Sequence, residues 1–184
     1  MNHEKEKGML MPLSAPERKW LYETLKKINF LSVLTFGEMD KLAESIFKKS
    51  FAGKSVICRQ GAPGDCFYIV YKGTVSVWAS REDKNEQLIT KLKPGSYFGE
   101  SALVSGEPRN ATAIADSRAE LFVLLKNDFS AIVEKNPQLK NRIRGTMAVR
   151  TSQRTIDLLH ARPEESKGFF SRLSGFFRFN SKAK

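Results

Sequence analysis

The chain has 184 residues, a hydrophobic content of 41% and a formal net charge of +11 at pH 7. This length and composition predict one compact domain with appendages and exclude a disordered chain. No run of about 18 apolar residues occurs, so the sequence predicts no membrane-spanning helix. The N-terminus lacks the apolar stretch of an export signal, and Cys58 and Cys66 lack metal-ligand spacing, which favours reduced thiols in the cytoplasm.

Residues 1–13 are polar, and we expect a mobile N-terminus there. Residues 14–50 predict two helices. The first begins at Ser14, with Pro16 in its first turn, and continues to about residue 28. The second runs from Gly37 to Lys48. Apolar residues recur at helical spacing in both, which predicts that one face of each helix packs against the rest of the domain.

From residue 51 the pattern changes to short β-type segments separated by turns. We expect strands over residues 56–58, 67–71, 75–78, 88–92, 111–115 and 120–125. The pattern predicts an α+β protein whose antiparallel β-roll, of the double-stranded β-helix or jelly-roll type, is flanked by N-terminal and C-terminal helices. The roll and the helices that follow it are expected to span residues 51–160.

Cupin metal enzymes share this architecture, but their sites need several histidines. The two histidines here are His3 and His160, and both lie outside the expected strands. We therefore expect no metal site. No histidine is available in the strand region to activate a serine, so the sequence predicts a binding protein and no enzyme.

The segment 97–112 carries the residues expected of a phosphate ester site. Gly99 allows the backbone to approach a ligand closely, and a short helix from this residue would direct free N–H groups at an anion. Arg109 supplies a planar fork for phosphate oxygens. Glu100 would be repelled by a phosphate, so we expect it to accept a hydrogen bond from a ribose hydroxyl. A phosphate beside a ribose hydroxyl indicates a nucleotide.

Together with the glycine-punctuated segment 61–73, this segment resembles the cyclic nucleotide-binding domains of protein kinase A regulatory subunits, nucleotide-gated channels and the catabolite activator protein. The resemblance covers roughly residues 31–150. It implies that Arg109 binds the cyclic phosphate, that Glu100 binds the ribose 2′-OH and that Asp65 orients Arg109. Only 24 residues follow His160, too few for a DNA-binding domain like that of the catabolite activator protein.

The resemblance also implies that backbone N–H groups near Ala102 and Ala111 bind phosphate oxygens. Phe98, Gly99, Ser101 and Asn110 complete the expected ligand-binding set. Ser101 departs from the aliphatic residue usual in the family. Asn110 can donate and accept hydrogen bonds, so its side chain can bind adenine or guanine. Between the two nucleotides, cAMP is favoured over cGMP.

Helices are expected over residues 127–136 and from Pro137 to about residue 159. In the resembling family such helices close over the base, and in some members they dimerise. No aromatic residue occurs between Phe129 and Phe169, so the candidate base caps are Ile143, Met147 and Arg150 or a later phenylalanine.

The C-terminal part is strongly basic. Residues 136–184 hold 11 Lys/Arg and 3 Asp/Glu, a net charge of +8. Within the segment 161–184, apolar side chains share one face of an expected amphipathic helix: Phe169, Phe170, Leu173, Phe176 and Phe177. This tail is expected to pack on its own domain or a dimer interface, or to bind an anionic membrane surface or an effector protein through residues 167–184. Nucleic acid is the least favoured partner.

The sequence therefore predicts a cyclic nucleotide sensor that relays the state of its ligand through its C-terminal helices and tail. We expect it in the cytoplasm, with peripheral membrane association through the tail as an option. The alternative is a β-roll that no longer binds nucleotide and serves as an interaction scaffold. Loss of nucleotide binding with retained partner binding would favour that alternative.

Overall fold

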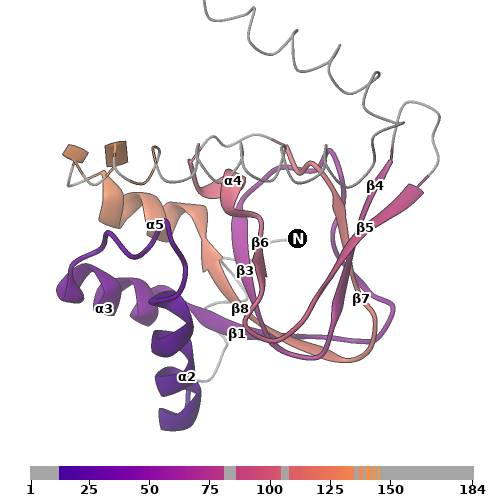
Figure 1. Ribbon diagram of the computed structural model, residues 1–184, viewed down its shortest axis with the longest axis horizontal. Coiled ribbons are helices and arrows are strands. Elements are labelled where there is room, and N and C mark those ends of the chain that lie inside the picture. Colours follow the sequence, from indigo (N-terminus) through magenta and orange to yellow (C-terminus); the bar gives the residue numbers. More distant parts are fainter. Residues whose placement is uncertain are drawn as a thin grey trace, which may run out of the picture. The chain divides into compact units, whose positions relative to one another are not determined.

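Two antiparallel four-stranded sheets form the centre of the molecule, and helices lie on one side of them (Figure 1). The computed structural model describes residues 13–80, 86–104, 108–134 and, beyond these, residues 137, 138, 140, 141, 143 and 145. The strand orders are β1-β8-β3-β6 and β2-β7-β4-β5. The expected α+β fold with an antiparallel β-roll is confirmed.

The helices are α2 (Ala15–Leu25), α3 (Phe36–Ser45), α4 (Glu100–Val104) and α5 (Lys126–Val133). The strands are β1 (Phe47–Phe51), β2 (Val56–Cys58), β3 (Cys66–Lys72), β4 (Val75–Ser80), β5 (Glu86–Leu92), β6 (Tyr97–Phe98), β7 (Thr112–Ala115) and β8 (Ala119–Leu125). No helix in the described ranges is long and apolar enough to cross a membrane.

Each N-terminal helix begins directly after a capping residue, Ser14 for α2 as expected and Thr35 for α3, which starts one residue before the expected Gly37. The backbone N–H of Ser14 donates to the Glu17 carboxylate over 2.9 Å, and the backbone N–H of Thr35 donates to the Glu38 carboxylate over 2.8 Å. Each pair is a capping box, in which a carboxylate three residues into the helix satisfies the backbone donor at its start. Local sequence is therefore sufficient to place both helix starts.

The second helix is shorter than expected, and the roll begins earlier. α3 ends at Ser45, and Ile46 has an extended backbone with ψ 135°. Phe47 then opens β1, which pairs antiparallel with β8 and sets Phe47 opposite Val123. This strand corrects two predictions. The helix does not reach Lys48, and the roll begins before residue 51. Phe47 is buried, and an apolar residue at this position fits the inner face of a helix as well as that of a strand, so its hydrophobicity alone does not distinguish the two.

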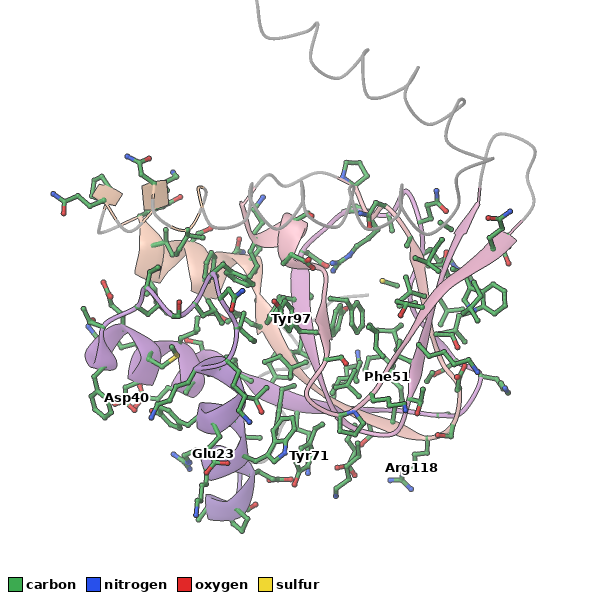
Figure 2. The ribbon with its side chains drawn as sticks, in the orientation of Figure 1. Glu23, Asp40, Phe51, Tyr71, Tyr97 and Arg118 are labelled. Atoms are coloured by element: carbon green, nitrogen blue, oxygen red, sulfur yellow. The ribbon has the colours of Figure 1, made fainter. Side chains whose placement is uncertain are left out.

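Strand β3 is buried on both faces because it lies between the interior of the roll and the helices. Tyr68 and Val70 point into the core between the sheets. On the opposite face, the Phe67 ring lies 5.7 Å from the Phe30 ring, and the Tyr71 ring lies 5.0 Å from the Trp20 ring. Figure 2 shows Tyr71 on the side of α2. Because side chains alternate along a strand, one face of β3 packs in the core between the sheets and the other face packs against the helices.

Helix α2 is held to the roll by charge as well as by aromatic packing. The Lys48 ammonium on β1 forms an ion pair with Glu17 and lies 4.0 Å from Glu120 on β8. Lys72 on β3 pairs with the same Glu120 carboxylate at 3.2 Å. The hydrogen bond from Lys48 and the backbone hydrogen bond from Ser14 lower the pKa of Glu17 from 4.5 to about 2. These contacts connect α2 to three strands of one sheet.

We predict that Glu17→Gln lowers the free energy of unfolding by about 1 kcal/mol at neutral pH, because the exchange removes a partly exposed ion pair and weakens the capping box. The pKa of Glu17 is lower in the folded chain than its ordinary 4.5. Its contribution is therefore present above about pH 4.5 and is lost as the pH falls towards about 2. Urea unfolding across this range measures the effect.

In that pH series, the free energy of unfolding of Glu17→Gln should decrease less steeply with falling pH than that of the wild type. The matched control is Glu23→Gln, which removes an exposed carboxylate from the same helix (Figure 2). Equal profiles for Glu17→Gln and Glu23→Gln would refute the assignment.

Candidate functional site

Arg109 lies in the segment between α4 and β7, and its backbone is fixed by a turn from another part of the chain. Its N–H donates to the Ala62 carbonyl over 2.8 Å, and its carbonyl accepts from the Gly61 N–H over 2.8 Å. Gly61 has φ 79°, a left-handed conformation that favours glycine. The glycine-punctuated turn before β3 therefore positions the arginine, although more than 40 residues separate the two in the sequence.

The side chain of Arg109 is buried, and only 7% of the residue is exposed. Its three guanidinium nitrogens are buried too, and within the described parts of the chain none has a hydrogen-bond partner. The nearest carboxylate is that of Asp65, whose Oδ1 lies 3.6 Å from Nη2 and whose side chain is 56% exposed. Burial of a charged group with its donors unused is costly unless a partner compensates it. The donors are therefore available to an anion.

Gly99 gives Arg109 the space that its guanidinium occupies. The residue has φ 81°, and a Cβ atom added to it would lie 2.4 Å from Arg109 Nη1 and 2.9 Å from the Cys66 carbonyl oxygen. Both the backbone conformation and this close approach require glycine. Gly99 was expected to let the backbone approach a ligand, and the structure shows that it lets the Arg109 guanidinium approach the backbone.

The groups beneath Arg109 are aromatic or neutral. The Arg109 Cζ atom lies 5.5 Å from the centre of the Tyr68 ring. Burial raises the pKa of Tyr68 well above its ordinary value and raises that of Cys66 to about 12. Burial also raises the pKa of Cys58, with the positive charge of Arg109 opposing the shift. The Tyr68 phenol and the two thiols are therefore neutral at physiological pH, and none of them supplies a negative charge to the guanidinium.

The remaining predicted ligand-binding residues flank Arg109 along the chain. Glu100 is half-buried in the first turn of α4, and Ser101 beside it is exposed. Ala102 follows in the same helix. Asn110 is exposed and Ala111 is half-buried, directly before β7. The structure thus places the predicted set on two segments, α4 with its preceding glycine and the approach to β7.

Of the three candidate base caps, the structure describes one. Ile143 is helical and 1% exposed. Met147 and Arg150 lie outside the described residues, as do the tail 161–184 and most of the helix expected to run to residue 159. The proposed dimer contact of that helix is likewise outside the described part.

Sequence reasoning missed Tyr68 as a part of this site. Tyr68 lies on β3, is 1% exposed and stacks on Phe98 with ring centres 4.9 Å apart and planes 18° apart. Strand alternation offered a signal, because it places Cys66, Tyr68 and Val70 together on the face of β3 that points into the roll. That signal does not say which buried ring meets the arginine.

A family model described as the cyclic nucleotide-binding domain matches residues 48–136. The cAMP-dependent protein kinase regulatory subunit of Hypocrea atroviridis is 33% identical over 78% of this chain and 30% of its own length. A cyclic nucleotide-gated potassium channel of Mesorhizobium japonicum is 34% identical over 58% of this chain and 28% of its own length. The chain thus spans less than a third of these two relatives.

Among solved structures, the regulatory domain of Toxoplasma gondii protein kinase A in a co-crystal with cAMP is similar with a TM-score of 0.61 and 28% identity. The match covers 74% of this chain and 50% of that chain. The fold of the described residues therefore agrees with a domain that has been solved with its cyclic nucleotide.

We predict that Gly99→Ala destabilises the protein by about 3 kcal/mol, because strain at a positive φ adds to overlap with the Arg109 guanidinium and the Cys66 carbonyl. The matched control is Gly95→Ala. Gly95 has φ 88°, but an added Cβ there would meet nothing within 4 Å. Gly95→Ala should lower the free energy of unfolding by only about 1 kcal/mol. Chemical unfolding of both variants gives the comparison, and equal losses would exclude a steric role for Gly99.

Proposed function

Residues 48–136 belong to the cyclic nucleotide-binding domain family, and on that premise we propose that this chain is a regulatory protein that binds a 3′,5′-cyclic nucleotide at Arg109. The observation that supports this proposal most is the buried Arg109 guanidinium, whose three nitrogens lack a hydrogen-bond partner among the described residues. Its activity is binding, and no catalytic step is part of the proposal.

The cyclic phosphate fits the charge and the geometry of Arg109. A phosphodiester carries one negative charge on two oxygens outside the ring, and the guanidinium presents parallel N–H donors that match such a pair. Contact between the two groups would compensate the buried positive charge. The Asp65 carboxylate, 3.6 Å from Nη2, would then share the guanidinium with the ligand and help to orient it.

The ribose is assigned to Glu100. The Glu100 backbone follows directly on Gly99, the residue in contact with Arg109, so a ligand on the guanidinium would lie next to the start of α4. The carboxylate would accept a hydrogen bond from the ribose 2′-OH. Backbone N–H groups near Ala102 and Ala111 are proposed to complete the phosphate contacts.

The preferred nucleotide is proposed to be cAMP. The kinase relatives are named as cAMP-dependent, which favours adenine. Asn110 is exposed beside Arg109, and its amide can donate to or accept from either base. Ile143, Met147 and Arg150 remain the candidate base caps. Closure of these C-terminal residues over the base would shift the population of helix positions and pass the ligand state to an effector protein.

The competing function is a scaffold whose roll no longer binds nucleotide. Under that hypothesis the tail alone would carry the activity, in the cytoplasm or at the surface of a membrane. The Arg109 donors favour the sensor, because a scaffold has no need of a buried guanidinium whose N–H groups lack a hydrogen-bond partner among the described residues.

We predict that the full chain binds cAMP more tightly than cGMP and that Arg109→Ala weakens cAMP binding by at least about 100-fold, because a buried charge-assisted contact is lost. Isothermal titration calorimetry with both nucleotides measures this. The control is Arg118→Ala, which removes the same charge from an exposed site in the β7–β8 turn, where the side chain points away from the roll (Figure 2).

Arg118→Ala should bind like the wild type. Absence of heat with either nucleotide for the wild type would support the scaffold, and equal affinities for wild type and Arg109→Ala would exclude Arg109 from the site.

For the tail, we predict that the full chain sediments with vesicles containing phosphatidylserine and that a chain ending at Arg162 does not. The basic residues would be drawn to the anionic surface while the phenylalanines enter the interface. Neutral phosphatidylcholine vesicles and raised salt should both reduce sedimentation of the full chain. Unchanged sedimentation after truncation would remove the membrane hypothesis and leave packing on the domain or a dimer interface, an effector protein and nucleic acid as interpretations of the tail.

A further inference from the structure

The Arg109 guanidinium lies over an aromatic ring that no residue of the expected ligand-binding set supplies. Its Cζ atom is 5.5 Å from the centre of the Tyr68 ring, and Tyr68 is 1% exposed. Arginine over a tyrosine face is attracted by the negative charge of the ring face, and the attraction grows when water is excluded. Burial provides that exclusion here.

This contact differs from a hydrogen bond because it uses none of the guanidinium donors. The ring stabilises the charge through its face, so all the N–H groups remain available to phosphate oxygens. Asp65 is the weaker restraint, because its Oδ1 lies 3.6 Å from Nη2, longer than a hydrogen bond, and its side chain is 56% exposed. The ring is therefore the better-buried of the two groups beside the guanidinium.

Tyr68 is itself held in position by Phe98. The two residues face each other in the β3–β6 ladder, and their rings stack with centres 4.9 Å apart and planes 18° apart. Phe98 precedes Gly99, which contacts the guanidinium from the backbone side. The stack thus connects the ring beneath Arg109 to the start of the α4 segment.

We propose that Tyr68, supported by Phe98, is a positioning residue that orients the Arg109 guanidinium for phosphate binding and stabilises its charge without using its donors. The inference rests on the proposed function, since it assigns a role within that site. The pKa of Tyr68 is raised by burial, so the phenol stays neutral over the physiological range and the ring face stays available.

The first test is calorimetric titration of the full chain with cAMP. Tyr68→Leu should weaken binding about tenfold, because a desolvated cation–π contact is lost. Tyr68→Phe keeps the ring face and should bind within about twofold of the wild type. Phe98→Leu leaves Tyr68 in place without its support, and it should show a smaller loss. Equal affinities for Tyr68→Leu and Tyr68→Phe would overturn the proposal.

A matched control separates this role from general packing. Tyr71 lies three residues further along β3, on the helix side, with its ring 4.8 Å from the Phe122 ring. Tyr71→Leu should lower the free energy of unfolding without changing the affinity for cAMP. A loss of affinity equal to that of Tyr68→Leu would assign both effects to packing.

The second test needs no nucleotide. A double-mutant cycle of Tyr68→Leu and Arg109→Met, read by urea unfolding of the full chain, measures the coupling between the two side chains. We expect that the two substitutions change the free energy of unfolding non-additively. Strictly additive changes would refute the contact between Tyr68 and Arg109, even if cAMP binds normally. A wild type that binds neither nucleotide would instead overturn the proposed function and the affinity role of Tyr68, while coupling in the cycle would still stand.

Discussion

A single buried positive charge constrains the arrangement of the residues around it. The Arg109 guanidinium is enclosed by protein, and within the described residues no hydrogen bond uses its donors. Two backbone hydrogen bonds to the Gly61–Ala62 turn fix the backbone of Arg109. Gly99, which has no side chain, leaves space for the guanidinium. Such a charge is tolerated because a ring face lies beneath it and a carboxylate lies nearby. The unused donors are what make the site suited to an anion.

Strand β3 connects this site to the helical layer. One face of the strand places Tyr68 under the arginine, and the other face places Phe67 and Tyr71 against the rings of Phe30 and Trp20. The same strand therefore contributes both to the surroundings of Arg109 and to helix docking. A displacement of the β3 backbone at the site would also displace the helices packed on it, because closely packed interiors transmit small shifts.

Much of the fold could be predicted from local pattern, and the exceptions have physical causes. The starts of α2 and α3 follow from capping residues, and the long strands follow from β-type side chains between turns. β1 was missed because a short apolar segment such as that around Phe47 fits a helix or a strand, and only pairing with β8 decides between them. β6 was missed because two residues are too few to show a period.

The sequence by itself determined which residue types the candidate site has. The spacing of Gly99, Glu100 and Arg109 in one short segment indicates a phosphate beside a ribose, since each residue type has its function whatever the rest of the fold. Tertiary structure alone decided that Arg109 is buried, that its donors are left unused by the described chain and that Tyr68 lies beneath it. Burial and ring contacts depend on strands that are distant in sequence and meet only when the sheets form, so no local pattern encodes them.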